Sequence, residues 1–171
     1  MVDFENTTPP GKDVDLVIGF TSQFELQRGQ FHLGGTHGML ARHILLREFS
    51  KSMTEMEKLE VLVHELGHYL GAAHAAEPTS VMRPVLGDRQ ARSKRFRIFY
   101  DPLNALAINI VAAEFRGGVR SRGELSQAGR ERLLPIYATI ANGDAEDPTT
   151  GNMLRCIGAQ KVDPRTQFRA P

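Results

Sequence analysis

One short string, HELGHYLGAAH, constrains this chain of 171 residues more than any other feature. On a helix, His64 and His68 lie one turn apart, so both imidazoles project from one face and can bind the same ion. Gly71 can adopt the left-handed conformation that ends a helix, after which the chain can bring back His74 as a third ligand. Three protein nitrogens leave one position on zinc open, as in catalytic zinc sites.

Two other interpretations of this string are a chance pattern and a zinc site that only holds the fold. Only 6 of the 171 residues are histidine, so a chance occurrence of the whole spaced pattern is rare. A purely structural site has no use for a carboxylate beside its first ligand, and Glu65 stands there. The string therefore favours a catalytic zinc ion bound by His64, His68 and His74, with Glu65 as general base.

Met82 follows His74 by eight residues, within the segment SVMRP. Together with the zinc string, this segment resembles the metzincin clan of zinc endopeptidases, in which a tight turn places a methionine under the metal. The short spacing is most similar to the matrixin group. The resemblance implies that Met82 forms a hydrophobic floor beneath the ligands. It also implies no tyrosine ligand, because Pro84 stands where some metzincins carry tyrosine. Taken alone, such a methionine is more often core filler.

The resemblance, which covers about residues 14–117, implies an α+β fold: a small mixed sheet packed on the zinc-motif helix, with further C-terminal helices. Two β-rich apolar runs, at 14–20 and 43–49, are short enough for strands. Metzincin catalytic domains have two strands and a long helix before the first of these runs, but only thirteen residues precede it here. We therefore expect a fold without those elements, with the sheet covered by others, such as a helix near 126–141.

Local signals bound two helices. Ser52 or Thr54 can cap the zinc-motif helix, because each is followed three residues later by a glutamate. Asp101 can cap a later helix that has Pro102 at its first position and Gly117 at its end. Helical spacing predicts that the zinc-motif helix buries five apolar residues: Met56, Leu59, Val63, Leu66 and Leu70.

A glycine-rich segment, LGGTHG, lies between the two predicted strands. In metzincins the corresponding segment forms a sheet edge above the cleft, and an extended substrate pairs with its backbone. Glycines permit such close approach. The resemblance therefore makes Gly34, Gly35, Thr36 and His37 candidate substrate-binding residues. A glycine-rich turn without a substrate role is the alternative.

The segment after Met82 is strongly basic, with Asp88 as its only acid: Arg83, Arg89, Arg92, Lys94, Arg95 and Arg97. By resemblance this segment builds the wall of the pocket for the residue after the cut. The cluster then favours substrates with acidic side chains. A solvated loop is the alternative.

Composition agrees with one globular domain, since 171 residues of which 41% are hydrophobic can bury a sizeable core. We expect a peptidase domain over residues 1–143 and a polar, loosely ordered tail over 144–171, packed locally through Met153, Leu154 and Ile157. The single cysteine excludes an intrachain disulfide. A net charge of +1 gives no reason to expect a nucleic-acid partner.

The predicted function is a zinc metalloendopeptidase that hydrolyses peptide bonds with a zinc-activated water and Glu65 as general base. The alternatives are a catalytically inactive zinc-binding module that interacts with peptides, and a polyanion binder that uses the basic segment. The acidic start MVDFEN lacks the apolar core of a signal peptide, and no apolar run reaches the roughly 18 residues of a membrane helix. Family analogy implies secretion if the chain begins at a processing boundary; compartment and oligomeric state are otherwise open.

Overall fold

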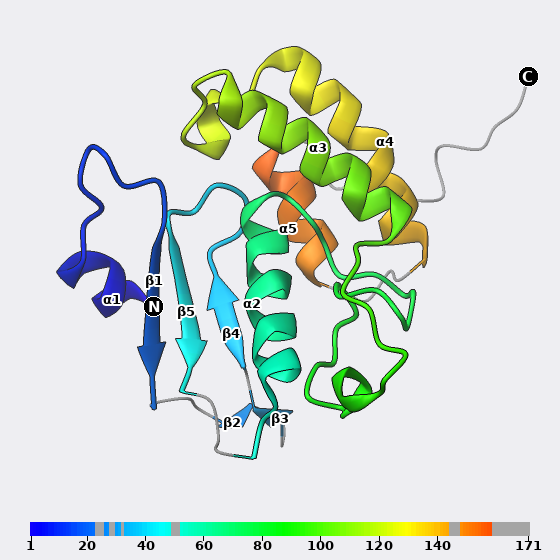
Figure 1. The fold of residues 1–171 in the computed structure, drawn as a ribbon. Coiled ribbons are helices and arrows are strands. Elements are labelled where there is room, and N and C mark those ends of the chain that lie inside the picture. The colour runs from blue at the N-terminus through cyan, green and yellow to red at the C-terminus, as the bar shows by residue number, and fades with distance from the viewer. Residues whose placement is uncertain (23–25, 28–29, 32, 49–51, 144–147, 159–171) are drawn as a thin grey trace, which may run out of the picture.

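The computed structural model describes residues 1–22, 26–27, 30–31, 33–48, 52–143 and 148–158. Its strands are β1 (Val17–Thr21), β2 (Leu26–Gln27), β3 (Gln30–Phe31), β4 (Gly34–Thr36) and β5 (His43–Arg47). Its helices are α1 (Val2–Thr7), α2 (Glu55–Tyr69), α3 (Pro102–Arg116), α4 (Gln127–Gly143) and α5 (Pro148–Cys156), with 3₁₀ turns at Gln90–Arg92 and Arg122–Glu124. Figure 1 shows that the sheet lies on one side of α2, and that helices α3, α4 and α5 are grouped on the other side of α2. The predicted α+β fold is confirmed.

The main sheet has the order β1-β5-β4. Strand β5 is central, parallel to β1 and antiparallel to β4, where Gly35 lies opposite Leu45. Ile44 and Leu46 of β5 are buried in the core. The run predicted at 14–20 overlaps β1, which begins at Val17 and ends one residue beyond the run. The run predicted at 43–49 contains β5, although Phe49 falls outside the described residues. Within the described part of the chain, β4 is an edge strand of this sheet.

Helix α1 is an element that the sequence did not predict. The ring of Phe4 packs on β1 at Gly19, where an added Cβ would lie only 2.5 Å from Phe4 Cζ. The same ring contacts His43 of β5 edge-on, with ring centroids 5.2 Å apart. Residues 1–16 therefore contain one short helix, which packs against the sheet through Phe4.

Thr54 begins α2 through a complete capping box. The Glu57 amide donates to Thr54 Oγ1, and the Thr54 amide donates to a Glu57 carboxylate oxygen at 2.7 Å. After the helix ends, Gly71 has a φ of +89°, in the left-handed region. An added Cβ there would also meet Val111 at 2.8 Å. The predicted cap and the predicted role of Gly71 are both confirmed.

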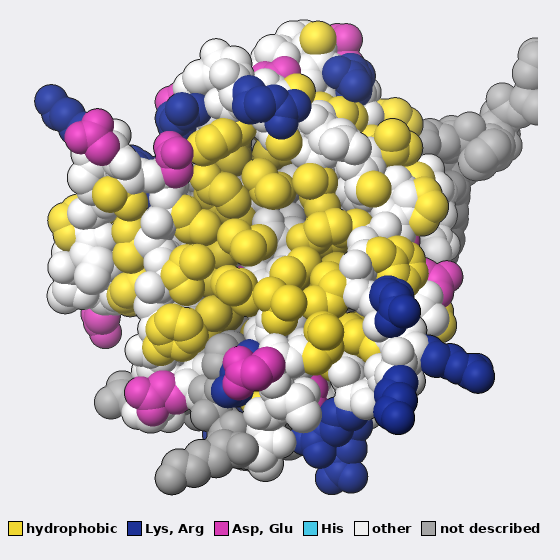
Figure 2. All heavy atoms as spheres, viewed as in Figure 1, with side chains coloured by type: hydrophobic (Ala, Val, Ile, Leu, Met, Phe, Trp, Pro, Cys, Tyr) yellow, Lys and Arg dark blue, Asp and Glu magenta, His cyan; other side chains and the backbone are white. Residues whose placement is uncertain are grey.

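The buried face of α2 differs from the prediction. Met56 and Leu59, expected in the core, are 43% and 46% exposed. Figure 2 shows hydrophobic side chains gathered on this side of the molecule, over α2 and the neighbouring sheet. The other three predicted residues, Val63, Leu66 and Leu70, are partly buried and pack against the core as expected. The fully buried face also carries polar groups: Glu57, Glu60, His64, Glu65 and His68.

Arginines from the basic segment explain how α2 can bury these carboxylates. Arg83 Nη2 lies 2.7 Å from Glu60 Oε1 and 3.0 Å from Asp88 Oδ1. The Arg92 Nε–H donates to Glu57 Oε1 at 2.7 Å. Buried charges are tolerated where they are paired, so distant partners decide which face of the helix lies inside.

Helix α3 has the predicted boundaries. The Asp101 carboxylate accepts the Asn104 amide at 3.1 Å, Pro102 is the first residue and Gly117 follows the last. Helix α4 lies close to the predicted 126–141, but it packs on α3 and α5 instead of covering the sheet. None of the helices among the described residues has the length and apolar character needed to cross a membrane.

Residues 148–158 differ from the loosely ordered tail that we expected. They form helix α5 and a following turn, because Met153, Leu154 and Ile157 supply an apolar face that packs in the common core. Packing through these three residues was predicted. Residues 144–147 and 159–171 lie outside the described part, and the domain division at residue 143 stays a prediction.

Candidate active site

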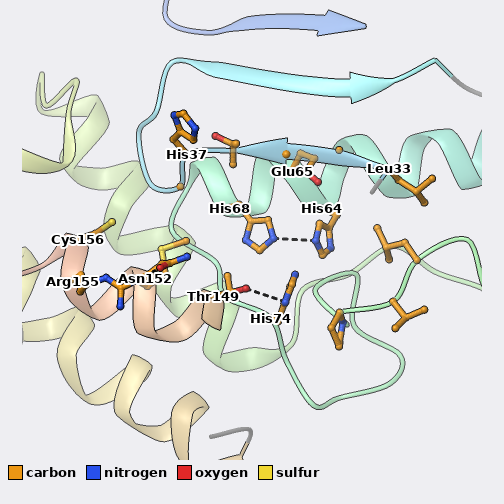
Figure 3. A pocket seen from close by; sticks show the side chains of 18 of the residues that line it. Leu33, His37, His64, Glu65, His68, His74, Thr149, Asn152, Arg155 and Cys156 are labelled. Atoms are coloured by element: carbon orange, nitrogen blue, oxygen red, sulfur yellow. Dashed lines mark hydrogen bonds between the residues drawn. The ribbon is translucent and has the colours of Figure 1, made fainter. Parts of the chain in front are cut away.

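A cleft of about 1070 Å³ runs along β4. Helix α2 forms its floor, residues 84–87 border it on one side and α5 closes another (Figure 3). Leu33 and His37 lie at opposite ends of the β4 border, with the side chains of the zinc string between them. The cleft thus brings together segments from both halves of the chain.

The three histidines predicted as ligands converge in this cleft. His64 and His68 project from α2, and His74 returns from the loop after the helix (Figure 3). One ring nitrogen from each lies within 4.8 Å of the others, and the Nε2 atoms of His64 and His68 are 3.0 Å apart. Nitrogens bound tetrahedrally to zinc stand roughly 3.3 Å apart. The cluster therefore fits one metal ion.

Hydrogen bonds orient the two helical histidines. The Nδ1 atom of His64 lies 2.8 Å from the Val81 carbonyl oxygen, and that of His68 lies 2.9 Å from the Ala72 carbonyl oxygen. A carbonyl only accepts, so each Nδ1 carries the proton and each Nε2 presents its lone pair to the cleft. Both rings are in the tautomer that a metal requires.

The protonation state of His64 also suits a ligand. Burial, followed by the neighbouring His68, lowers the pKa of His64 well below its ordinary value. The neutral imidazole, which is the metal-binding form, is therefore favoured.

Glu65 lies beside these histidines, on the floor of the cleft below β4. Its side chain is buried, and an added Cβ on Gly34 would lie 2.6 Å from Glu65 Oε1. Burial raises the pKa of Glu65 to about 8. Without a metal ion beside it, a carboxyl with such a pKa is mostly protonated at pH 7.

Met82 is fully buried next to α2. An added Cβ on Gly67 would lie 2.6 Å from Met82 Sδ, so the absence of a side chain on Gly67 lets the methionine approach the helix. The turn is held by hydrogen bonds: the Met82 amide donates to Ser80 Oγ at 3.1 Å, and the Ala75 amide donates to the Met82 carbonyl at 2.9 Å.

The candidate substrate-binding residues Gly34, Gly35, Thr36 and His37 all border the cleft. His37 Nδ1 lies 2.9 Å from Glu5 Oε1, which links the end of this border to α1. Their contact with substrate stays a prediction.

The basic segment is placed differently from our expectation. Within residues 83–97, the apolar stretch 84–87 borders the cleft, and none of the basic residues does. Arg83 and Arg92 are paired with the glutamates of α2, so they do not present charge to a substrate. The arginines that do border the cleft are Arg122 and Arg155.

Sequence reasoning missed the contribution of α5, which adds Thr149 and Arg155 to the cleft. One available signal was the dipeptide Asp147-Pro148, which repeats the pattern that marks the start of α3. The sequence alone gave no indication that this helix returns to the histidines.

In a comparison with protein families, residues 1–107 match the model of the matrixin family. The chain belongs to the matrixin family. No curated protein and no solved structure gave a match. The matched region of this matrixin holds the sheet, α2, the three histidines and Met82, and it ends within α3. Matrixins are a family of zinc metallopeptidases, with which the histidine cluster is compatible. Helices α4 and α5 lie outside the match.

Proposed function

We propose that this matrixin is a zinc-dependent endopeptidase in which His64, His68 and His74 hold the metal and Glu65 is the general base. The observation that carries the proposal is the convergence of the three imidazoles and this buried carboxyl at one point of a cleft along an edge strand. Zinc bound there would polarise the scissile carbonyl and lower the pKa of a water molecule.

Glu65 is the residue that transfers the proton in the proposed reaction. It accepts a proton from the attacking water and returns it to the leaving amine, so the same carboxyl acts as base and then as acid. Burial raises the pKa of Glu65, and a zinc ion bound beside it would lower that pKa and favour the ionised base. Its position depends on Gly34, which leaves the space that the carboxyl occupies.

Strand β4 is the proposed docking edge for the substrate backbone. A peptide can add to an edge strand through main-chain hydrogen bonds, and β4 pairs with β5 on one side only within the described sheet. Because β4 borders the cleft on both sides of the histidines, a peptide can extend past the reacting bond in both directions (Figure 3). This arrangement favours cleavage within a chain, and Met82 supports the ligands from below.

The charge of the cleft suggests which peptides it accepts. Glu65 is the only acidic residue among the described residues that line it, whereas Arg122 and Arg155 lie at the α5 end. Both arginines are solvent-exposed. We therefore expect a preference for substrates with an acidic side chain at the α5 end of the cleft.

The decisive experiment is cleavage profiling of a diverse peptide mixture by mass spectrometry. Zinc-loaded protein is compared with Glu65→Gln, which keeps all three ligands, and with chelated protein. We expect cleavage by the wild type alone, with Glu65→Gln still binding one zinc ion. A wild type that binds zinc stoichiometrically and cleaves nothing would instead indicate a zinc-binding peptide-interaction module.

A further inference from the structure

Helix α5 reaches the histidine cluster through its second residue. Thr149 Oγ1 lies 3.0 Å from Nδ1 of His74 (Figure 3). We propose that Thr149 is a positioning residue, which orients His74 and selects its metal-binding tautomer. The inference rests on the proposed role of His74 as a ligand, and it assigns a function to a part of the chain that lies outside the matrixin match.

His74 differs from its two partners in how it is held. His64 and His68 are anchored in α2, and backbone carbonyls accept from both of their Nδ1 atoms. His74 lies in the loop beyond Gly71 and is less buried than the other two. Its Nδ1 contacts a side chain that stands 75 positions later in the chain. A ligand on a loop needs such a contact, because partners of this kind fix ring orientation and tautomer.

Metal binding by His74 depends on which group donates in the contact between Thr149 Oγ1 and His74 Nδ1. A threonine hydroxyl can donate or accept. If Nδ1–H of His74 donates to Thr149 Oγ1, the lone pair of Nε2 is free for the metal. If Thr149 donated to Nδ1 instead, Nε2 of the neutral ring would carry the proton and could not bind. Metal binding therefore requires Thr149 as acceptor, and loss of its oxygen should weaken the binding.

The packing of α5 keeps Thr149 in place. Thr150, Met153 and Leu154 are buried, and the last two belong to the core cluster shared with α4. Arg130 of α4 also donates to the Cys156 carbonyl at 3.5 Å. The hydroxyl is thus presented by an anchored helix, so the orientation of His74 depends on residues outside the family match.

The test compares zinc affinities by competition with a chelator. Thr149→Val removes the acceptor and keeps the shape, Thr149→Ser keeps the hydroxyl, and Thr139→Val is the matched control, since its hydroxyl donates to the Pro135 carbonyl within α4. We expect about tenfold weaker zinc binding for Thr149→Val and wild-type affinity for the other two. Wild-type affinity in folded Thr149→Val would overturn the proposal.

A second test follows the Nδ1 proton of His74 in the wild-type protein, so it does not depend on whether a variant folds. In zinc-loaded protein labelled with ¹⁵N, His74 should carry a proton on Nδ1 that exchanges slowly with solvent. A rapidly exchanging Nδ1 proton would overturn the inference even if Thr149→Val failed to fold. Neither readout depends on peptide cleavage, so the positioning role can stand when the peptidase activity fails. A wild type that binds no zinc would overturn both proposals.

Discussion

Gly34 of β4 and Glu65 of α2 are so close that a Cβ atom on the glycine would lie 2.6 Å from Glu65 Oε1. The neighbouring Gly35 has ample room, because its added Cβ would meet only Met1 Cε, at 3.9 Å. Two adjacent glycines in one strand therefore differ sharply in what they contact.

We predict that Gly34→Ala displaces the Glu65 carboxyl and lowers kcat by about 100-fold, since a shift of about 1 Å in a reacting group can cost that much. Gly35→Ala should keep kcat close to the wild-type value. Steady-state kinetics on a peptide identified by the cleavage profile would check this. Equal kcat values for the two variants would contradict the proposed position of Glu65.

Zinc should stabilise the folded protein. A ligand that binds only the native state raises the free energy of unfolding, by about 2.7 kcal/mol when its free concentration is 100 times Kd. We expect zinc to raise the Tm of the wild type and of His37→Ala, whose ring lies at the end of the cleft border. His68→Ala should lose most of the increase. Thermal unfolding with and without zinc measures it, and an undiminished increase in His68→Ala would exclude that ligand.

Removing Arg83 should destabilise the protein in a pH-dependent way. Burial is the largest influence on Glu60 and raises its pKa, while Arg83 opposes that rise. A carboxyl with a raised folded-state pKa contributes stability below its unfolded pKa and loses it as the pH rises through the folded value. In Arg83→Met the pKa of Glu60 should rise further, so the variant should lose about 3–5 kcal/mol of unfolding free energy at neutral pH and less near pH 5.

Urea unfolding of the wild type and Arg83→Met, from about pH 5 to neutral pH, would measure the loss of unfolding free energy. The double variant Glu60→Gln with Arg83→Met provides the control, because it removes the carboxyl group that Arg83 neutralises. It should recover much of the lost stability and show a weaker pH dependence. A loss in Arg83→Met that did not change with pH would show that packing, and not the charge of Glu60, was responsible.

Charge reversal can locate the residues that select substrates. Arg155→Glu, on α5, should reduce the cleavage of peptides with acidic residues at that end of the cleft and favour basic ones. Arg95→Glu, in the basic segment away from the lining, should leave the preference unchanged. Cleavage profiles of the two variants distinguish the α5 arginine from the segment first expected to select acidic substrates. The reverse result would restore the earlier hypothesis.

Features governed by neighbours in the sequence were predictable. The capping box of Thr54, the cap at Asp101 and the turn at Gly71 each depend on residues within a few positions. The pairing of His64 with His68 follows from helical spacing. These interactions are local, so their signals survive without knowledge of the fold.

Features governed by distant partners were not predictable. Met56 and Leu59 follow an apolar pattern, yet they are exposed, because Arg83 and Arg92 allow α2 to bury its glutamates instead. These two arginines of the basic segment pair with Glu60 and Glu57 of α2, so they point toward the helix.

The sequence by itself determined the spacing of the three histidines and the ends of α2 and α3, because spacing and capping act over a few residues. The class of fold followed from the resemblance to the metzincins. The tertiary structure alone decided which face of α2 is buried, that Gly34 makes room for Glu65, and that α5 brings Thr149 to His74. These relationships join residues 23 to 75 positions apart, and they depend on how whole elements pack. No local pattern encodes such packing, so only the folded chain reveals it.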